Sequence, residues 1–239
     1  MTQQALAPRH RPPLPRKRKL LTAGLIALVV AAVVGGGLFL QLRTTAAEAD
    51  GYGPARTPAR ITGSAVVTLG PANAPHAVDV YEDPLCPYCS QFEQRFGQLL
   101  AKAADEGKAR VNYHILTFLD EKSASRSYST RAASTLLCAV QSNGAAFGPL
   151  HDRLMATGTQ PKENASADLT DEELARFAGE AGAGPGVAAC LRAGTHAGVL
   201  RDTTAAVHPT IPGTPTVRID GRLVPRDEVP GGDWADPLR

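Results

Sequence analysis

The sequence is poor in side chains that bind soft metals. It has four cysteines and two methionines in 239 residues, and aromatic residues make up only 5% of the chain. A structural zinc site needs four ligands and a catalytic one at least three, but no second Cys-x-x-Cys and no His-x-x-x-His accompanies the single motif Cys86-Pro87-Tyr88-Cys89. We therefore expect no metal and no cofactor. The scattered histidines are expected to be surface or hydrogen-bonded residues: His76, His114, His151 and His196.

The chain also lacks a strong excess of charge of either sign. Its formal net charge is +2, and seven of its 25 basic residues lie in residues 1–43, where there is no acid. The remaining 18 basic and 23 acidic residues give the rest of the chain a net charge of −5. A mildly acidic body offers no electrostatic reason to bind nucleic acid, so we expect none.

One long run has no charged residue at all, from Leu20 to Leu42. Its 23 residues exceed the roughly 20 that a helix needs to cross a bilayer. Four basic residues at 16–19 precede it, which predicts a cytoplasmic N-terminus and an extracytoplasmic body. Residues 1–19 are thus a cytoplasmic basic tail and 20–42 a transmembrane signal-anchor helix of a single-pass cell-membrane protein. Ala47-Glu48-Ala49 resembles a cleavage site, so a cleaved signal peptide remains the alternative, and both readings export the body.

The rest of the chain is organised as a small α/β domain with an all-helical insertion. Residues 43–60 are polar, lack periodicity and are predicted to be a flexible linker. The folded body spans 61–229, with a helical insertion at 121–207, and 230–239 are a C-terminal tail with too many glycines and prolines for a helix. Strands are predicted at 65–69, 77–81, 111–116, 216–219 and 222–224, and a helix at 90–104 follows the cysteine motif. Thr170-Asp171-Glu172-Glu173 is a capping box that predicts the start of a helix within the insertion.

The Cys-x-x-Cys motif between a strand and a helix favours redox chemistry over an inert structural disulfide. A sulfur at a helix N-terminus meets unsatisfied N–H groups and the positive end of the helix dipole, which favour thiolate. Cys86 is therefore predicted to be the reactive, partly exposed sulfur, with Pro87 at the first helical position. Cys89, within the first turn, is predicted to be more buried and to resolve the mixed disulfide. Asp79 and Glu82 could accept its proton, although we expect them to be solvated.

Two segments resemble the DsbA-like thioredoxin family: residues 81–93, which hold the cysteine motif, and Gly213-Thr214-Pro215-Thr216-Val217. The resemblance covers about residues 61–226. It implies a thioredoxin-like fold with an inserted helical subdomain, in which Cys86 is the nucleophile and Cys89 the resolving thiol. It also implies that Pro215 is cis and lies beside the motif, and that Thr214 offers backbone contacts to a substrate chain. Pro87 and Tyr88, between the cysteines, support the site and tune its potential.

The remaining cysteines, Cys138 and Cys190, form the natural second pair because Cys86 and Cys89 are so close in sequence. The resemblance to actinobacterial relatives implies that they form a structural disulfide that pins two inserted helices. The alternative is two free, buried thiols. The sequence departs from the family in two places: Val80 stands where many thioredoxin-like members have an acid, and the family's terminal helix is weak or missing after Val229.

Together these features predict a protein thiol:disulfide oxidoreductase that oxidises cysteines of exported proteins and is reoxidised by a quinone-linked membrane partner. The first alternative is a disulfide reductase or isomerase, although the sequence contains no recognisable dimerisation domain of the kind that isomerases use. A non-catalytic module that holds a partner or Cu(I) on its two thiolates is the second alternative. Against copper, Met155 is the only methionine besides the initiator.

Overall fold

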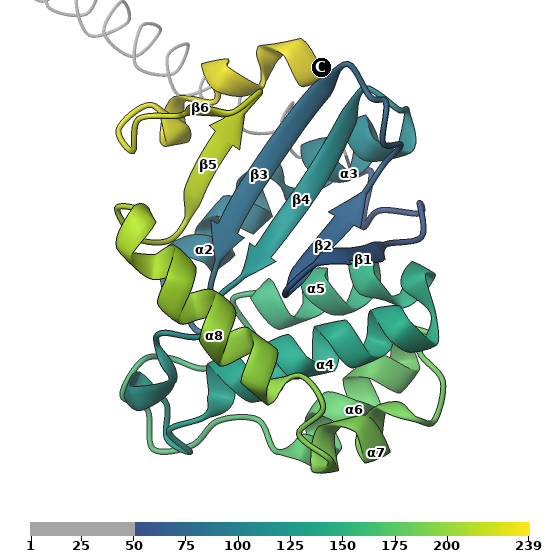
Figure 1. Ribbon diagram of the computed structural model, residues 1–239, viewed down its shortest axis with the longest axis vertical. Helices are drawn as coiled ribbons and strands as arrows, with labels where there is room; N and C mark the ends of the chain where they lie inside the picture. The colour runs from purple at the N-terminus through teal and green to yellow at the C-terminus, as the bar shows by residue number, and fades with distance from the viewer. Residues whose placement is uncertain (1–50) are drawn as a thin grey trace, which may run out of the picture. The chain divides into compact units, whose positions relative to one another are not determined.

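The structure, a computed structural model, describes residues 51–239 (Figure 1). The predicted basic tail, the transmembrane helix at 20–42 and the first part of the linker, residues 43–50, lie outside the described residues. Within 51–239, no helix is both long and apolar enough to cross a bilayer.

The body is built on one six-stranded sheet with the strand order β1-β2-β4-β3-β5-β6. Only the central pair, β3 and β4, is parallel, and every other pair is antiparallel. This arrangement confirms the predicted α/β class with thioredoxin-like character. The strands are β1 (Arg60–Gly63), β2 (Val66–Leu69), β3 (His76–Glu82), β4 (Ala109–Ile115), β5 (Thr216–Ile219) and β6 (Arg222–Leu223).

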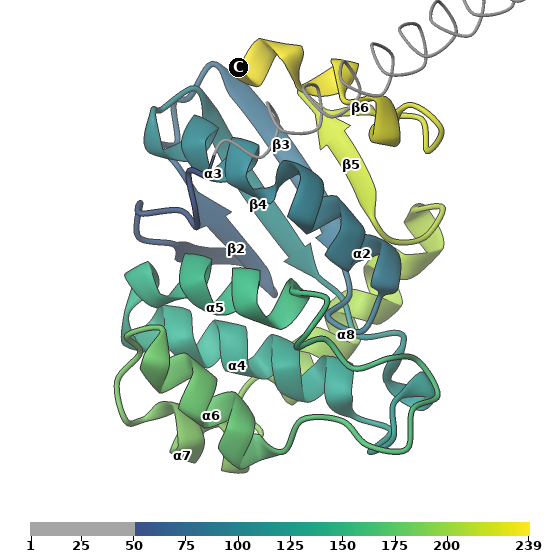
Figure 2. The same ribbon diagram turned by 180° about the vertical axis from the view of Figure 1, so that it is seen from behind.

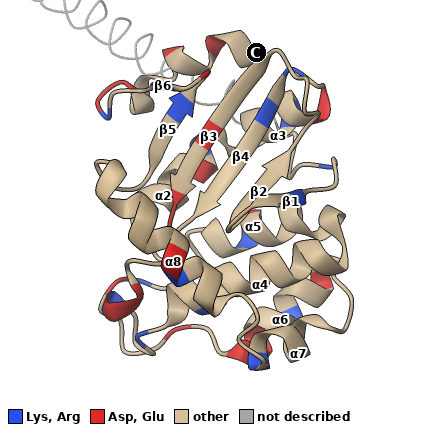
Figure 3. Ribbon diagram, in the orientation of Figure 1, with Lys and Arg blue, Asp and Glu red and all other residues tan. Residues whose placement is uncertain are grey.

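The two faces of the sheet differ in polarity because side chains alternate along each strand. On β3, Val78, Val80 and Glu82 are buried, whereas Asp79 and Tyr81 between them are half-buried. Figure 3 shows acidic positions on β3 and basic positions on β4 and β5. Of these, Asp79, Arg110 and Arg218 are half-buried and belong to the more open face. The buried face is therefore the one against which helices must pack.

A single helical rod covers that buried face, as seen from behind in Figure 2. It consists of α2 (Pro87–Phe92), a five-residue π-helical segment (Glu93–Gly97) and α3 (Gln98–Asp105). Phe92, Phe96 and Leu100 are buried on one side of the rod, as their spacing predicts. The π-helical segment in its middle has no counterpart in the sequence prediction.

The inserted block folds into helices below the sheet, with α4 and α5 side by side in both views (Figures 1 and 2). The α6 helix starts with the predicted capping box, in which Thr170 and Glu173 each accept the other's backbone N–H. The described helices of this block are α4 (Tyr128–Ser142), α5 (Phe147–Met155), α6 (Asp171–Glu180), α7 (Val187–Arg192) and α8 (Ala197–Val207).

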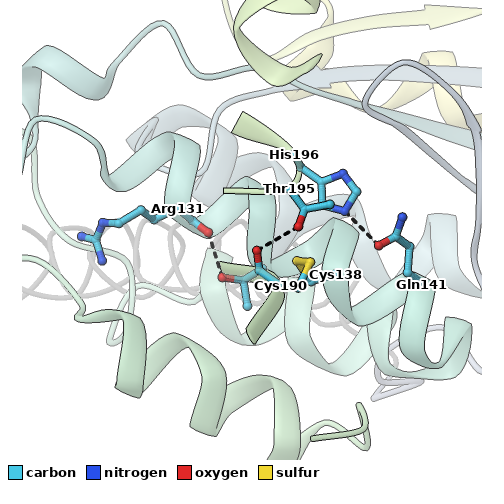
Figure 4. Close-up of a disulfide and its surroundings, with 7 residues drawn as sticks. Arg131, Cys138, Gln141, Cys190, Thr195 and His196 are labelled. Carbon is cyan, nitrogen blue, oxygen red and sulfur yellow. Dashed lines mark hydrogen bonds between the residues drawn. A yellow bond between two sulfur atoms is a disulfide. The ribbon is translucent and has the colours of Figure 1, made fainter. Parts of the chain in front are cut away.

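A disulfide between Cys138 and Cys190 ties α4 to α7 (Figure 4). Their Cα atoms are 6.1 Å apart and 52 positions apart in sequence. Next to it, the His196 ring hydrogen-bonds the Gln141 side chain at 3.1 Å and Thr195 donates to the Cys190 carbonyl at 3.2 Å. The structure thus has the pairing that the family resemblance implied, rather than two free thiols.

The prediction of a flexible linker up to residue 60 is wrong for its described part. Ala55 and Ala59 are buried, and the Ala59 amide donates to the Gly144 carbonyl at 3.0 Å. A Cβ on Gly144 would lie 2.2 Å from the Ala59 carbonyl oxygen, so the contact requires glycine. The Asp105 carboxylate also accepts the Thr57 amide at 2.7 Å. The segment is held through its backbone amides, by residues far away in the sequence. Such contacts do not require a periodic pattern of hydrophobic side chains, so the segment's own sequence does not reveal them.

The C-terminal residues 230–239, which the sequence assigned to a tail without a helix, also pack on the body. A 3₁₀ helix spans Asp233–Leu238, and its Ala235 and Leu238 are buried. The Trp234 ring lies 5.2 Å from the Phe96 ring, centroid to centroid. Short 3₁₀ turns tolerate the glycines and prolines that argue against an α-helix, which explains the difference.

Candidate active site

Cys86 stands at the N-cap of α2, where the chain leaves β3. Its extended backbone lets its carbonyl accept the Cys89 amide at 3.1 Å, and Pro87 occupies the start of the helix, where no N–H is needed. Cys86 exposes 4% of its surface and Cys89 none, whereas Tyr88 between them is 62% exposed. The prediction that Cys86 is partly exposed is therefore wrong, because its side chain is almost completely buried.

The two sulfurs differ in acidity because of how each is surrounded. A hydrogen bond from the Cys89 thiol is the largest influence on Cys86 and, despite the opposing effect of burial, helps to lower the pKa of Cys86 to about 6. The Thr214 side chain and the backbone N–H groups of Cys89 and Tyr88 act in the same direction. Complete burial raises the pKa of Cys89 well above its ordinary value, and its proximity to Cys86 adds to this effect. At neutral pH the pair thus holds one thiolate, on Cys86.

The loop before β5 lies directly against the reactive sulfur. The Thr214–Pro215 bond is cis, and the Cys86 sulfur is 3.5 Å from the Thr214 carbonyl oxygen. Gly213 has a φ of 133°, which L side chains rarely adopt, so glycine is required at this bend. Arg226 donates from Nη2 to the same Thr214 carbonyl at 3.3 Å. The structure therefore brings the four residues of the motif together with Thr214 and Pro215.

Asp83 organises the turn that presents Cys86, although the sequence did not single it out. Its Oδ1 accepts the Leu85 amide at 2.9 Å and the Ser129 hydroxyl at 2.6 Å, and its Oδ2 accepts the Leu119 amide at 3.0 Å. Burial raises the pKa of Asp83 to about 7 in spite of these three donors. One carboxyl group thus joins the active-site turn to the helical block.

Three further hydrogen bonds fix this turn and the start of α2 to the end of α5 and the segment that follows it. The Gln160 side chain donates to the carbonyls of Pro84 and Cys86, both at 3.0 Å. Ser90 donates to the Met155 carbonyl at 2.6 Å. The backbone on either side of Cys86 is therefore held by the inserted block as well as by the sheet.

A buried cluster of Glu82, His151 and Glu93 lies deeper in the same region. His151 Nε2 is 2.6 Å from Glu82 Oε1, and His151 Nδ1 is 3.8 Å from Glu93 Oε2. The expectation that Glu82 is solvated is wrong, because its side chain is fully buried. The even-numbered positions of β3 are the buried ones, so the alternation 78, 80, 82 could have placed Glu82 on the core face. Nothing local to His151 or Glu93 marks them as its partners.

The charges of this cluster depend on one another. Burial raises the pKa of Glu93 to about 8, although the charge of His151 opposes this. Burial would lower the pKa of His151, but the neighbouring charges of Glu82 and Glu93 outweigh it and raise that pKa to about 9.

Asp79, the other acid considered as a proton acceptor, lies on the opposite face of the sheet. Its Oδ1 accepts hydrogen bonds from His114 at 2.9 Å and from Asn112 at 3.0 Å. The half-buried Asp79 therefore has its own partners and takes no part in the cysteine site.

A groove of about 590 Å³ opens beside the cysteine motif. Its lining combines aromatic and aliphatic side chains with two arginines, Arg95 and Arg226. The lining includes Tyr88, Phe92, Phe96, Pro215, Arg226 and Val229. Tyr88 and the cis Pro215 therefore both border this groove.

The described residues contain two groups with three potential metal ligands within 4.8 Å of one another. One is Cys138, Cys190 and His196, but its two sulfurs are bonded to each other. The other is the cluster of Glu82, Glu93 and His151. Among the His, Cys, Asp and Glu side chains of the described part of the chain, none joins Cys86 and Cys89 as a third ligand within that distance.

Comparison with known proteins places this geometry in context. A family model described as thioredoxin matches residues 62–230. The crystal structure of reduced DsbA from Mycobacterium tuberculosis is similar, with 30% identity and a TM-score of 0.62 over 67% of this chain and 84% of that one. The MdbA thiol-disulfide oxidoreductase from Corynebacterium diphtheriae is similar at 25% identity, with a TM-score of 0.64 over 77% of this chain and 94% of that one.

A curated relative is the serine/threonine-protein kinase PknE of Mycobacterium tuberculosis, which is 33% identical over 148 residues. The match covers 62% of this chain but only 26% of the kinase. The chain thus spans about a quarter of the length of the curated relatives that it matches.

Proposed function

The chain belongs to the thioredoxin family, in its DsbA-like group, and from this membership we propose that it oxidises cysteine pairs of exported proteins through a Cys86–Cys89 disulfide. Its enzyme class is protein thiol:disulfide oxidoreductase, the class of the solved structures that it resembles. The single observation that supports oxidation is the position of Cys86 at the N-cap of α2, beside the amides of Tyr88 and Cys89, which help to lower the pKa of its thiol to about 6.

The reaction begins when a substrate thiolate attacks the Cys86 sulfur of the disulfide. The Cys86–Cys89 bond breaks, a bond between substrate and Cys86 forms, and Cys89 leaves with the electron pair and takes up a proton. A second substrate thiolate then attacks the substrate sulfur of the mixed disulfide, and Cys86 leaves as a thiolate. Because a low-pKa thiol is the better leaving group, this second step favours release of an oxidised substrate.

The substrate chain binds in the groove beside Pro215. The Thr214 carbonyl already accepts from Arg226, and the backbone at the cis proline lies within reach of a chain attached to Cys86. The exposed Tyr88 offers a ring for apolar contact at the mouth of the groove. Substrates are therefore unfolded or flexible cysteine-containing segments that can enter an apolar groove in an extended form.

The enzyme works outside the cytoplasm, anchored through residues 20–42. The charge-free run of 23 residues and the basic residues before it support this topology. The enzyme's two electrons then pass to a quinone-linked membrane partner, which restores the disulfide. A truncated chain that begins at residue 51 lacks the proposed anchor. If this chain oxidised substrates in isolated membranes as well as it does in solution, the result would argue against a role for the anchor.

To test the function, a reduced, unfolded protein is mixed with a stoichiometric amount of the enzyme in its Cys86–Cys89 disulfide form. The number of protein thiols that become oxidised is then measured. We expect the wild type to oxidise two thiols per enzyme and Cys86→Ser to oxidise none. The matched control is the double variant Cys138→Ala with Cys190→Ala, which removes the other cysteine pair and should retain the activity. Equal rates for wild type and Cys86→Ser would refute the proposal.

The reduction potential of the Cys86–Cys89 couple separates oxidation from reduction. A potential near ~−120 mV, that of a strong oxidant, supports net oxidation, whereas one near ~−270 mV identifies a reductase.

A further inference from the structure

Two arginines line the groove beside the cysteine motif, and the exchange reaction described above assigns no role to their charge. Arg226 lies in the turn after β6, and Arg95 lies in the π-helical segment of the rod. We propose that Arg226 selects substrates that carry an acidic side chain two positions from the reacting cysteine, within an otherwise apolar extended segment. The inference rests on the proposed function, because it names the class of substrate that this same site oxidises.

The first observation is the contact between Arg226 and the loop that holds the cis proline. Its Nη2 donates to the Thr214 carbonyl at 3.3 Å, and the same oxygen lies 3.5 Å from the Cys86 sulfur. A Cβ on Gly213 would lie 3.6 Å from Nη2, so the guanidinium also lies close to the bend before the proline. The guanidinium and the reactive sulfur therefore approach one carbonyl oxygen, and a substrate bound to Cys86 passes close to the positive charge.

The second observation is that no carboxylate neutralises this charge within the described part of the chain. Arg226 donates to the neutral Thr214 carbonyl, and no ion pair joins its guanidinium to an acid of residues 51–239. Asp227 and Glu228 follow it directly and are exposed, but neither forms such a pair. Because the planar fork of N–H donors on arginine matches a carboxylate, Arg226 is suited to bind an acidic side chain of a substrate.

The third observation is the charge of the groove itself. Its lining contains Arg226 and Arg95 but no acid, whereas the chain beyond residue 43 carries a net charge of −5. The Arg95 guanidinium lies 5.4 Å from the centre of the Phe96 ring, so positive charge stands beside the aromatic part of the lining. Most of the other lining residues are apolar. The groove thus complements a segment that combines apolar side chains with an acidic one.

The turn that carries Arg226 is fixed by its own hydrogen bonds. The Pro225 carbonyl accepts the Glu228 amide at 2.9 Å and the Val229 amide at 3.1 Å. The Trp234 indole then donates to the Val229 carbonyl at 3.1 Å. Because the backbone of this turn is held in place, the arginine is presented at the groove with little backbone entropy left to lose on binding.

The spacing of the acidic residue follows from the geometry of an extended chain. Side chains alternate along such a chain, so residues two positions apart point to the same side and are separated by about 6.6 Å. The substrate cysteine points toward Cys86, so its second neighbours, and not its first, project toward the enzyme. Arg226 and Cys86 contact the same Thr214 carbonyl, so a side chain at this spacing can reach the guanidinium.

The test compares two peptides that differ only in charge. One carries glutamate two positions before and two positions after a single cysteine, and the other carries glutamine at both places. The readout is the initial rate at which each reduced peptide forms a mixed disulfide with the full-length oxidised enzyme, with the product trapped by acid. Each rate is divided by the rate of that peptide with a small uncharged disulfide, which corrects for the effect of glutamate on the peptide's own thiol.

We expect the wild type to prefer the glutamate peptide by about 3- to 10-fold at low ionic strength, and by less in high salt. Arg226→Gln should lose this preference, and Arg226→Lys should retain part of it. Arg226→Glu should instead favour a peptide with lysine at the same two positions. If Arg226 only supported the loop, its replacement would change both rates by one factor and leave their ratio intact, and this outcome would overturn the proposal.

The matched control is Arg222→Gln, which removes an exposed arginine of β6 that lies outside the groove lining. It should keep the wild-type preference, and an equal loss in both variants would mean general charge attraction and contradict the contact with Arg226. Moving the glutamates next to the cysteine should weaken the preference, and an unchanged preference there also counts against the proposal. If the wild type reacts with both peptides at equal corrected rates, only this inference fails, whereas if it reacts with neither, the proposed function itself fails.

Discussion

The reactivity of Cys86 is decided by groups within a few ångströms of one sulfur atom. The N-cap position supplies the amides of Tyr88 and Cys89, and the Cys89 thiol makes the strongest contribution. Asp83 and Gln160 hold the backbone that presents the sulfur. The site is thus pre-organised by hydrogen bonds rather than by a charged partner side chain.

At this scale we predict that Cys86 titrates near pH 6 in the reduced enzyme, whereas free cysteine titrates at about 8.5. The measurement is the rate of alkylation by iodoacetamide as a function of pH. Replacing Cys89 by alanine removes the largest stabilising contact and should move the midpoint upward, whereas Cys89→Ser retains a donor and should move it less. A wild-type midpoint above about 8 would contradict the site described here.

At the scale of elements, two helices begin where their sequence signals predict. Pro87 starts α2, and the Thr170 capping box starts α6. The α6 start is also held from outside, because Arg131 of α4 donates to the Leu169 carbonyl at 2.7 Å and to Asp171 at 3.0 Å. Local capping and a contact between helices thus act at the same helix end.

We predict that Thr170→Ala lowers the free energy of unfolding by about 1 kcal/mol, because the Glu173 amide loses its acceptor. Urea denaturation followed by circular dichroism measures the effect. Thr170→Ser keeps the hydroxyl and should change the stability far less. If serine and alanine were equally destabilising, the loss would come from the threonine methyl group and not from the cap.

At the scale of the whole molecule, two kinds of long-range constraint stand out. The Cys138–Cys190 disulfide closes a chain segment of 52 residues and joins α4 to α7. The buried carboxyl groups Asp83 and Glu93 join the sheet and its helical rod to the inserted block. Both act on the stability of the body as a unit.

Removing the disulfide by Cys138→Ala with Cys190→Ala should lower the free energy of unfolding by about 4 kcal/mol, from the loop-closure entropy of a segment of this length. Chemical denaturation measures the loss. Under native conditions the initial rate of substrate oxidation should remain close to that of the wild type, because the disulfide makes no contact with Cys86. A loss of activity without a loss of stability would contradict a purely structural role.

The oxidised enzyme should lose stability as the pH rises from about 5 to about 9. The pKa values of Asp83, Glu93 and His151 are raised in the folded state, to about 7, 8 and 9, so the native protein binds these protons more tightly than the unfolded chain does. Their stabilising effect is complete below the unfolded pKa values, about 4 for the acids and 6.5 for histidine, and is lost as pH passes the folded values. Denaturation at a series of pH values measures the slope.

Glu93→Gln should flatten the part of this slope that lies below about pH 8, since one of the three groups no longer titrates. Asp79 and Asp105 have lowered pKa values and act in the opposite direction, but only near and below about pH 4. A stability that rose between pH 5 and pH 9 would contradict the buried, protonated cluster.

The sequence by itself determined the α/β class, the cysteine motif at a helix start, five of the six strands of the described sheet and the capping box of α6; the edge strand β1 (Arg60–Gly63) was not predicted. Each depends on residues close together in the chain: alternation along β3, proline after Cys86, threonine three positions before glutamate. Such short-range patterns act on the backbone directly, so they can be interpreted before the fold is known. The roles of Thr214 and Pro215 came from resemblance, since nothing local shows that they meet Cys86.

Only the tertiary structure decided which groups surround the cysteines and which segments join the body. Glu82, Glu93 and His151 come from three elements, and Glu82 and His151 are 69 positions apart, so no local pattern connects them. Residues 51–59 have no periodicity of their own because glycines and an aspartate elsewhere in the chain provide their binding surface. The physical reason is the same in both cases: burial and charge coupling depend on distance in space, which the order of residues along the chain does not encode locally.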